Sequence, residues 1–247
     1  MATTESAFDT MALRYDELWD RTATGTHQRQ AVWNAVDPLV QRGHRILDLG
    51  CGTGTDALHL RSLGASLLGI DNSAAMVRIA RQRGVEALLL PIERLYELNE
   101  SFAGAVSNFG VLNCALNLRQ VASNLARLIV PGGYFAACLM GPCCAWEIIY
   151  FLLKGKPGKA FRRLRTTPAR WMGMEIRYPG KRAIQAEFWP YFRLVRWSGV
   201  GLCAPPSYIK NLGEACIEKL AQVDARLAHT PVIRALSDHR LFIFERI

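Results

Sequence analysis

The sequence predicts an α/β protein in which a doubly wound, mostly parallel sheet is covered by helices on both faces. Three observations lead to this prediction: short apolar runs alternate with helical patterns, the first run ends in a glycine-rich turn, and no internal repeat is present. Strands separated by helices form βαβ units, in which the strands are parallel. The chain has 247 residues, which is enough for one sizeable core and too few for two ordinary domains.

The spacing of apolar residues predicts the individual elements. Helices are expected over 8–41, 54–63, 74–83, 117–129, 182–189 and 207–228. Strands are expected over 45–49, 65–71, 85–90, 102–110, 134–140, 192–203 and 240–247. Asn72 or Ser73 can cap the helix over 74–83, because both side chains accept hydrogen bonds from a first helical turn.

We divide residues 1–247 into four parts of one domain. Residues 1–41 form an N-terminal helical lid, and residues 42–140 form the core that would bind a cofactor. Residues 141–182 interrupt the regular alternation after the fifth strand and are rich in basic and aromatic residues, so we expect a helical cap there. Residues 183–247 supply the closing helices and strands.

Composition excludes several classes of protein. The seven cysteines are odd in number and contain no C-x-x-C pair, which favours reduced thiols, a cytoplasmic protein and no metal site. No apolar run reaches the length of a membrane span; the longest candidate, 143–153, contains Glu147. The N-terminus has neither a basic start nor an apolar centre, so we do not expect a secretory signal.

The net charge of +9 is concentrated in one segment. Residues 154–182 contain ten Lys and Arg and a single acid, Glu175, so this segment accounts for the whole excess. It could draw an acidic small substrate into the site, contact a membrane peripherally, bind RNA, or only keep the cap soluble. Nucleic acid is an unlikely partner by this reading, because the rest of the chain is balanced in charge.

The glycine-rich turn at Gly50, Gly52 and Gly54 follows a strand and opens a helix. Glycines there let backbone N–H groups approach a ligand at the carboxyl ends of the strands. The spacing G-x-G-x-G departs from the dinucleotide fingerprint, and the turn lacks the Lys of a phosphate-binding loop. Asp71 ends the next strand about twenty residues on, where a carboxylate can accept the hydroxyls of a ribose. The pattern therefore predicts a ribose-bearing ligand without phosphate.

Four stretches carry a family resemblance: "ILDLGCGTG" (46–54), "GID" (69–71), "AVSNFGVLN" (105–113) and "LIVPGGYF" (128–135). In order and spacing they resemble the class I S-adenosylmethionine-dependent methyltransferases, over residues 1–140 and the closing strands. The resemblance implies a Rossmann-like seven-stranded sheet with the last strand antiparallel. It also implies S-adenosyl-L-methionine as cofactor and methyl transfer to O, N or C of a small, partly apolar metabolite.

The same resemblance implies which residues bind the cofactor. The methionine part would lie against Gly50, the Cys51 backbone and Gly52. Asp48 would orient the loop or accept from the ammonium group, and Asn108 would lie near the methionine and sulfonium through its backbone or side chain. Asp71 would hold the ribose, Asn72 and Met76 would flank ribose and adenine, and Ile92 would pack on adenine. The acid that often binds the adenine amino group is absent, because Pro91 occupies its place.

Four residues are candidates for catalysis, each with an alternative structural role. Tyr15, in a segment resembling the lid helix of small-molecule methyltransferases, could reach the sulfonium or simply pack. His27 could be a general base or a surface residue. Asn113 could contact substrate beyond the fourth strand or cap a turn. Glu147 could be a base or hydrogen-bond anchor, or an acid at a helix start.

Other functions stay open at this level. The chain could methylate a lipid or membrane-associated substrate, or it could be a non-catalytic binding subunit with a methyltransferase fold. A nicotinamide oxidoreductase is disfavoured by the glycine spacing. The stretch "SNFG" lacks the N/D-P-P-Y/F signature of enzymes that methylate RNA bases. The sequence does not indicate the oligomeric state.

Overall fold

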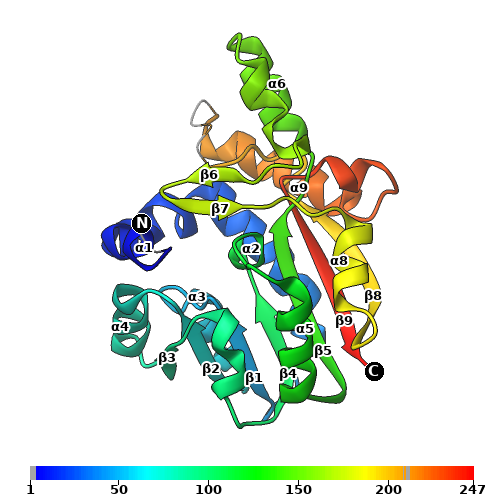
Figure 1. Cartoon of the computed structure of the whole chain (residues 1–247). Helices are drawn as coiled ribbons and strands as arrows, with labels where there is room; N and C mark the ends of the chain where they lie inside the picture. The colour runs from blue at the N-terminus through cyan, green and yellow to red at the C-terminus, as the bar shows by residue number, and fades with distance from the viewer. Residues whose placement is uncertain (1–3, 208, 210–211) are drawn as a thin grey trace.

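The computed structural model describes residues 4–207, 209 and 212–247, and its centre is a seven-stranded sheet (Figure 1). The strand order is β3-β2-β1-β4-β5-β9-β8. The strands are β1 (Arg45–Leu49), β2 (Ser66–Asp71), β3 (Ala87–Leu89), β4 (Phe102–Ser107), β5 (Ile129–Met140), β8 (Phe192–Val200) and β9 (His239–Arg246).

Only β9 runs against the other strands of this sheet. It pairs antiparallel with both β5 and β8, whereas the pairs from β3 to β5 are parallel. The predicted mostly parallel sheet with an antiparallel last strand is therefore confirmed. The order reverses between β1 and β4, which makes the carboxyl end of β1 the place where open α/β sheets bind ligands.

The sheet is buried on both faces because side chains alternate along its strands. In β1, Ile46 belongs to one apolar core and Leu47 and Leu49 to the other. The helices that cover the first core are α5 (Leu118–Leu128) and α8 (Lys181–Phe188). The helices on the second core are α2 (Ala23–Val36), α3 (Thr55–Ser62) and α4 (Ala74–Gln82). The helix α9 (Glu214–Leu227) packs against α2.

The N-terminal lid is helical, as predicted, but in several pieces. It comprises α1 (Thr4–Met11), the 3-10 turn η1 (Ala12–Arg14), a π-helical turn η2 (Asp16–Asp20) and α2, followed by η3 (Asp37–Leu39). The break before α2 has a local cause: Thr22 is extended, and its side chain accepts a hydrogen bond from the Gly25 N–H at 3.0 Å. A side chain at Gly25 would meet the Trp19 carbonyl oxygen at 1.9 Å, so glycine permits this sharp restart.

The insertion after β5 begins with helices and ends in strands. It contains α6 (Ala145–Leu153), α7 (Pro157–Ala160), η6 (Arg162–Leu164) and a hairpin of β6 (Ala169–Trp171) and β7 (Met174–Ile176). The predicted helical cap is thus half of the insertion. The hairpin escaped prediction because its strands have only three residues each and turn at Met172–Gly173, both with positive φ.

Figure 1 shows the hairpin crossing above the carboxyl ends of the strands toward α1, while α6 projects away from the sheet. The remaining elements are η4 (Ile92–Glu97), η5 (Val111–Asn113) and η7 (Ile233–Leu236). The helix predicted over 207–228 begins only at Glu214, and its positions Tyr208, Lys210 and Asn211 lie outside the described residues. Within the described part of the chain, no helix is both long and apolar enough to cross a bilayer.

Candidate cofactor and acceptor site

The glycine turn leaves β1 at the point where the strand order reverses. Its own N–H groups are engaged within the protein: those of Gly50 and Cys51 donate to the Ile70 carbonyl at 2.8 and 3.0 Å. The Gly54 N–H donates to the Cys51 carbonyl at 2.9 Å. These main-chain donors therefore shape the turn, and contact of these three residues with a ligand stays a prediction.

The glycines are required for different reasons. A side chain on Gly50 would meet Val111 at 2.2 Å, and one on Gly54 would meet Val85 at 2.9 Å. At Gly52, with φ +53°, a side chain would meet nothing within 4 Å. Close packing thus explains the first and third glycine, and only Gly52 borders open space.

Two oxygen atoms beside the turn are buried and lack a hydrogen-bond partner: Asp48 Oδ2 and Asn108 Oδ1. Asp48 lies opposite Val106 in the β1–β4 register, and Asn108 follows two residues later. The Asp48 side chain is 2% exposed, and burial raises its pKa well above the usual value, with the nearby Asp56 adding to the effect. Unpartnered acceptors of this kind fit a ligand that brings N–H donors or positive charge.

Asp71 fixes the other side of the turn. Its carboxylate accepts from the Gly52 N–H and the Ser73 N–H, both at 2.9 Å. Burial raises the pKa of Asp71, and these two backbone donors act against the rise. The residue is partly exposed, and a carboxylate offers about four acceptor positions, so it has capacity for further donors such as sugar hydroxyls.

Ser73, rather than Asn72, caps α4: its side chain accepts from the Met76 N–H at 3.2 Å. Met76 is buried and packs with Ala12 and Tyr15 of the lid. Ile92 is 9% exposed and begins η4 directly after Pro91. The residues expected around ribose and adenine therefore lie at the ends of β2 and β3, next to the lid.

Three aspartates of the lid bind the loops that follow β1 and β2. Asp9 accepts from the Ser73 hydroxyl and the Ala75 N–H. Asp16 accepts from the Thr53 hydroxyl at 2.7 Å and pairs with Arg83. These contacts hold the lid against the glycine turn and the start of α4.

The third lid aspartate, Asp20, belongs to a buried ion cluster. Arg29 bridges Asp20 at 2.6 Å and Asp56 at 2.5 Å. Asp56 also accepts from the Trp33 indole at 2.7 Å and the Asn108 amide at 2.9 Å. Sequence reasoning missed this cluster, although two signals were present: an Asp four residues after Asp16, and an Asp two residues after the last glycine of the turn.

Aromatic rings from two segments meet above the site. Tyr15 lies 5.1 Å from Trp19 and 6.5 Å from Phe8, and Phe8 lies 6.2 Å from Trp171 at the turn of the hairpin (ring centroids). Burial raises the pKa of Tyr15, and the negative charge of Asp20 raises it further. The lid and the hairpin thus contribute to one aromatic cluster, in which Tyr15 lies near enough to Asp20, Asp56 and Asp71 to feel their charge.

Asn113 is buried and its side chain is fully used by the backbone. The amide donates to the Met140 carbonyl at 3.0 Å and the Arg177 carbonyl at 2.6 Å, and its oxygen accepts from the Met140 N–H at 2.8 Å. The Arg177 N–H donates to the Asn113 carbonyl at 2.8 Å. This arrangement favours a structural clamp; contact with substrate stays a prediction.

Glu147 lies in the base of α6, apart from the carboxylates around the glycine turn. It is 1% exposed and pairs with Arg162 at 2.6 Å and with Arg163 at 2.7 Å, while Arg163 also pairs with Asp238 at 2.7 Å. The pairing favours an anchoring role over proton transfer. His27 is partly exposed in α2, and among the described residues we see no hydrogen bond that joins it to the other candidates.

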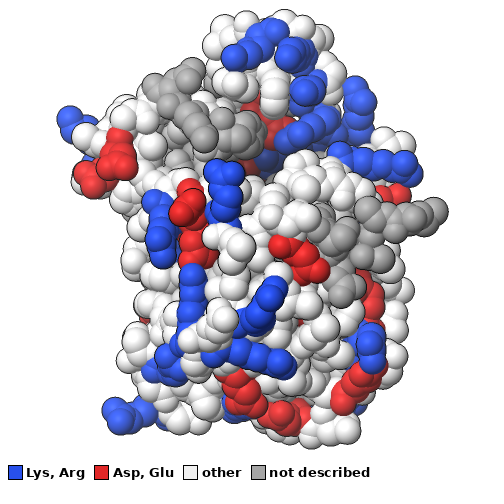
Figure 2. Space-filling view, turned by 90° about the vertical axis from the view of Figure 1, so that its left-hand side faces the viewer, with Lys and Arg blue, Asp and Glu red and all other residues white. Residues whose placement is uncertain are grey.

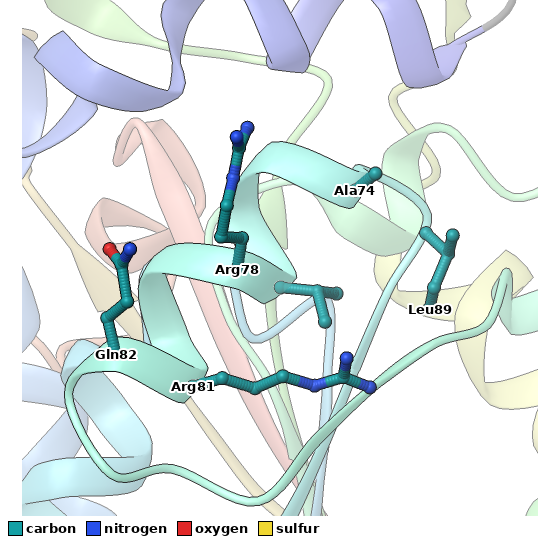
Figure 3. Close-up of a pocket in the computed structure, with 6 residues that line it drawn as sticks. Ala74, Arg78, Arg81, Gln82 and Leu89 are labelled. Atoms are coloured by element: carbon teal, nitrogen blue, oxygen red, sulfur yellow. The ribbon is translucent and has the colours of Figure 1, made fainter.

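Two surface pockets lie away from this site. One of about 430 Å³ is formed by the outer face of α4 and by Leu89, and Figure 3 shows Arg78, Arg81 and Gln82 projecting from the helix around it. The other, of about 320 Å³, lies between α4 and the outer side of the lid. Neither pocket includes a residue of the glycine turn. The candidate site is therefore defined by the arrangement of residues around Asp48 and Asp71 and not by the size of a pocket.

Comparison with known proteins supports a methyltransferase site at the glycine turn. Residues 46–133 match the family described as a methyltransferase domain. Over this segment the chain matches a methyltransferase domain, and the fold and the turn agree with the class I S-adenosylmethionine-dependent methyltransferases, whose cofactor is S-adenosyl-L-methionine. A solved S-adenosylmethionine-dependent methyltransferase from Mesorhizobium loti has the same fold, with a TM-score of 0.62, 19% identity, and coverage of 92% of this chain and 99% of that one.

Particular relatives share more sequence. The demethylmenaquinone methyltransferase of Corynebacterium kroppenstedtii is 31% identical over 137 residues, 53% of this chain and 57% of that protein. The 2-phytyl-1,4-naphtoquinone methyltransferase of Thermosynechococcus vestitus is 33% identical over 149 residues, 54% of this chain and 62% of that protein. The chain thus spans about three fifths of the length of these relatives. Magnesium protoporphyrin IX methyltransferase from Synechocystis, solved with S-adenosylhomocysteine, has a TM-score of 0.61 at 14% identity over 98% of this chain and 97% of that one.

Proposed function

We propose that the protein transfers a methyl group from S-adenosyl-L-methionine to a small, partly apolar aromatic acceptor of the hydroxylated naphthoquinone class. The two curated relatives named above act on naphthoquinones, which supports this class of acceptor. The aromatic cluster of Phe8, Tyr15 and Trp171 also suits contact with a flat aromatic molecule.

The observation that carries the proposal is the buried, unpartnered Oδ2 of Asp48 in an acidic cup. Asp48, Asp56 and Asp71 lie close enough to influence each other's charge, and Arg29 offsets only part of it. Negative potential suits a ligand with an ammonium and a sulfonium group. It opposes a pyrophosphate, which argues against a nicotinamide dinucleotide.

The cofactor would be held by residues of three loops. Asp48 and Asn108 would accept from the ammonium group, and Gly50, Cys51 and Gly52 would form the wall against the methionine part. Asp71 would accept from the ribose hydroxyls. The adenine would lie among Asn72, Met76 and Ile92, with Tyr15 closing the cup from the lid.

When bound, S-adenosyl-L-methionine supplies a methyl group on a sulfonium that is already activated by its charge. The protein therefore has to align the acceptor and exclude water, which the lid and the hairpin can do together. A hydroxyl acceptor must also lose a proton. We assign this step to His27, because the raised pKa of Tyr15 keeps its hydroxyl protonated and because Asn113 and Glu147 already have partners within the fold.

Calorimetry with S-adenosylhomocysteine tests cofactor binding, with NADH as the competing ligand. We expect binding of the first and none of the second. Transfer of a radiolabelled methyl group to a panel of hydroxylated naphthoquinones then tests the acceptor class. Absence of S-adenosylhomocysteine binding would contradict the whole proposal, whereas binding without transfer to any member of the panel would contradict only the acceptor class.

A further inference from the structure

The insertion begins with a helical projection that the proposed reaction does not use. Residues 148–165, which we call the tip, comprise the outer part of α6, α7 and η6. The base of α6 is fixed by buried Cys144 and Glu147, and α6 and α7 pack on each other. Figure 1 shows α6 projecting away from the sheet. The tip is thus an outward helical feature on an anchored base.

The exposed part of the tip is unusually apolar. Leu153 is 84% exposed, Ile149 53% and Leu164 56%, and Leu152 and Phe161 are also exposed. Scattered single apolar residues are normal on a surface, but these five belong to one short helical unit. Such a cluster indicates a contact with an apolar medium or partner.

The charges of the tip are all of one sign. It contains Lys154, Lys156, Lys159, Arg162, Arg163 and Arg165 and no acid. Arg162 and Arg163 turn inward to Glu147, whereas the three lysines and Arg165 are exposed. Figure 2 shows Lys and Arg gathered over the lobe at the top of the molecule, where the tip lies. The structure therefore divides the basic segment into inward cations that hold it and outward cations that face solvent.

Two of the outward lysines also lie beside aromatic rings. The Lys154 Nζ is 5.1 Å from the Tyr150 ring centre, and the Lys159 Nζ is 5.9 Å from that of Phe151. Leucine and aromatic side chains flanked by lysines match the chemistry of a bilayer interface, where apolar groups enter the acyl boundary and cations meet headgroups.

We propose that the tip is a docking site for an anionic membrane surface, with Leu152, Leu153 and Phe161 inserted at the interface and Lys154, Lys156 and Lys159 on the headgroups. One-sided charge favours a lipid surface over a second copy of this chain, because two tips would repel each other. The exposed apolar residues of the tip favour lipid over RNA, because an RNA backbone would bind the cations and leave these apolar side chains without a partner. Docking needs neither cofactor nor acceptor, so it stands or falls separately from the proposed reaction.

Vesicle flotation with the full chain tests the proposal. We expect the protein to float with phosphatidylcholine vesicles that contain 30% phosphatidylglycerol, to bind pure phosphatidylcholine at least tenfold more weakly, and to release as salt is raised, in accord with screening of the charges. Lys154→Gln/Lys156→Gln should lower the vesicle partition roughly tenfold, as should Leu153→Ser.

Matched variants elsewhere control for general charge and apolarity. Lys219→Gln/Arg226→Gln on α9 removes the same net charge, and Val195→Ser on β8 removes an apolar residue that is 56% exposed. Both should leave vesicle binding unchanged. The proposal is overturned if the wild-type protein does not float, if tip and control variants float alike, or if sedimentation shows a dimer that the tip variants dissolve while no variant binds vesicles.

Discussion

Arg29 and Arg163 have similar structural roles in two regions of the molecule. Each is almost fully buried and joins two carboxylates from different elements: Arg29 joins Asp20 and Asp56, and Arg163 joins Glu147 and Asp238. The first bridge ties the lid to the helix after the glycine turn, and the second ties the insertion to the start of β9. The two covers of the sheet are therefore fastened by the same chemistry.

The surroundings of the two bridges differ. The Arg29 bridge shares Asp56 with Asn108, whose free oxygen borders the cup, so its charge balance is felt where the cofactor is proposed to bind. Among the described residues, Arg163 pairs with Glu147 and Asp238 and not with a residue around the glycine turn; the neighbours of this bridge are Arg162 and the ring of Tyr178. We therefore expect the Arg29 bridge to affect both stability and cofactor binding, and the Arg163 bridge to affect stability alone.

Removing either arginine should have the largest effect on stability. Arg29→Met and Arg163→Met each remove the cation that two buried carboxylates share, and breaking a buried ion pair typically costs about 3–5 kcal/mol. Urea unfolding measures this loss. Calorimetry should then separate the two regions: S-adenosylhomocysteine binds more weakly to the Arg29 variant and normally to the Arg163 variant. Equal binding by both variants would remove the distinction.

Asp71→Ala tests the cup itself. Hydrogen bonds to charged groups contribute about 1.5–3 kcal/mol, so the affinity for S-adenosylhomocysteine should fall roughly 10- to 100-fold. The matched control is Glu86→Ala, which removes an exposed carboxylate paired with Arg45 at the far end of the sheet. An unchanged affinity in the Asp71 variant would show that this carboxylate does not hold the sugar.

The raised pKa of Asp48 predicts a pH dependence of binding. In the free protein this carboxyl takes up a proton at a higher pH than an ordinary aspartate, and a cationic ligand must displace that proton. Affinity should therefore weaken as pH falls from 8 toward 5, by at most about tenfold per unit for one proton. Asp48→Asn should bind weakly and lose this dependence; a persistent slope would assign it to another group.

The pH dependence of protein stability has the opposite sign to that of ligand affinity. Because the folded-state pKa is raised, the Asp48 contribution favours the folded protein at acid pH and is lost as pH rises above the ordinary value for aspartate. The free protein should accordingly gain stability from Asp48→Asn near neutral pH, which thermal unfolding with and without S-adenosylhomocysteine can measure.

Trp171→Ala should have the smallest effect and should separate acceptor from cofactor. An aromatic pair contributes about 0.5–1.5 kcal/mol, so losing the contact with Phe8 should raise the KM for the acceptor roughly 2- to 10-fold. S-adenosylhomocysteine affinity should not change. Tyr96→Ala, which removes another exposed aromatic side chain, is the control. A fall in cofactor affinity alone would place the hairpin over the cofactor instead.

Local patterns in the sequence were sufficient to predict the sheet and its strand directions. Each strand from β1 to β5 is an apolar run bounded by turn residues, and the rule that βαβ units are parallel does the rest. The hairpin in the insertion lay beyond such reasoning, because six residues in two strands carry too little periodicity. Thr22 could have been recognised as a capping residue. The helical spacing of apolar residues continues on both sides of it, however, so one uninterrupted helix was predicted.

The site was predictable only where one motif contains it. Asp48, Gly52 and Asp71 come from motifs, whereas the Arg29 bridge joins residues 20, 29 and 56, whose proximity depends on how the lid folds back. The packing role of the glycines was not predictable for a related reason: the neighbours of Gly50 and Gly54, Val111 and Val85, come from later segments. Long-range packing decides such questions, and a single sequence does not encode it locally.

Asn113 gives the fold a practical consequence. Because one side chain binds the chain where the insertion departs, at Met140, and where it returns, at Arg177, the two ends of that excursion are fastened at a single point. The insertion between Met140 and Arg177 can therefore be replaced as a unit. A short linker between those two positions would close the core without altering its strand order. Grafting a different cover onto the same clamp is a direct route to new acceptor preferences.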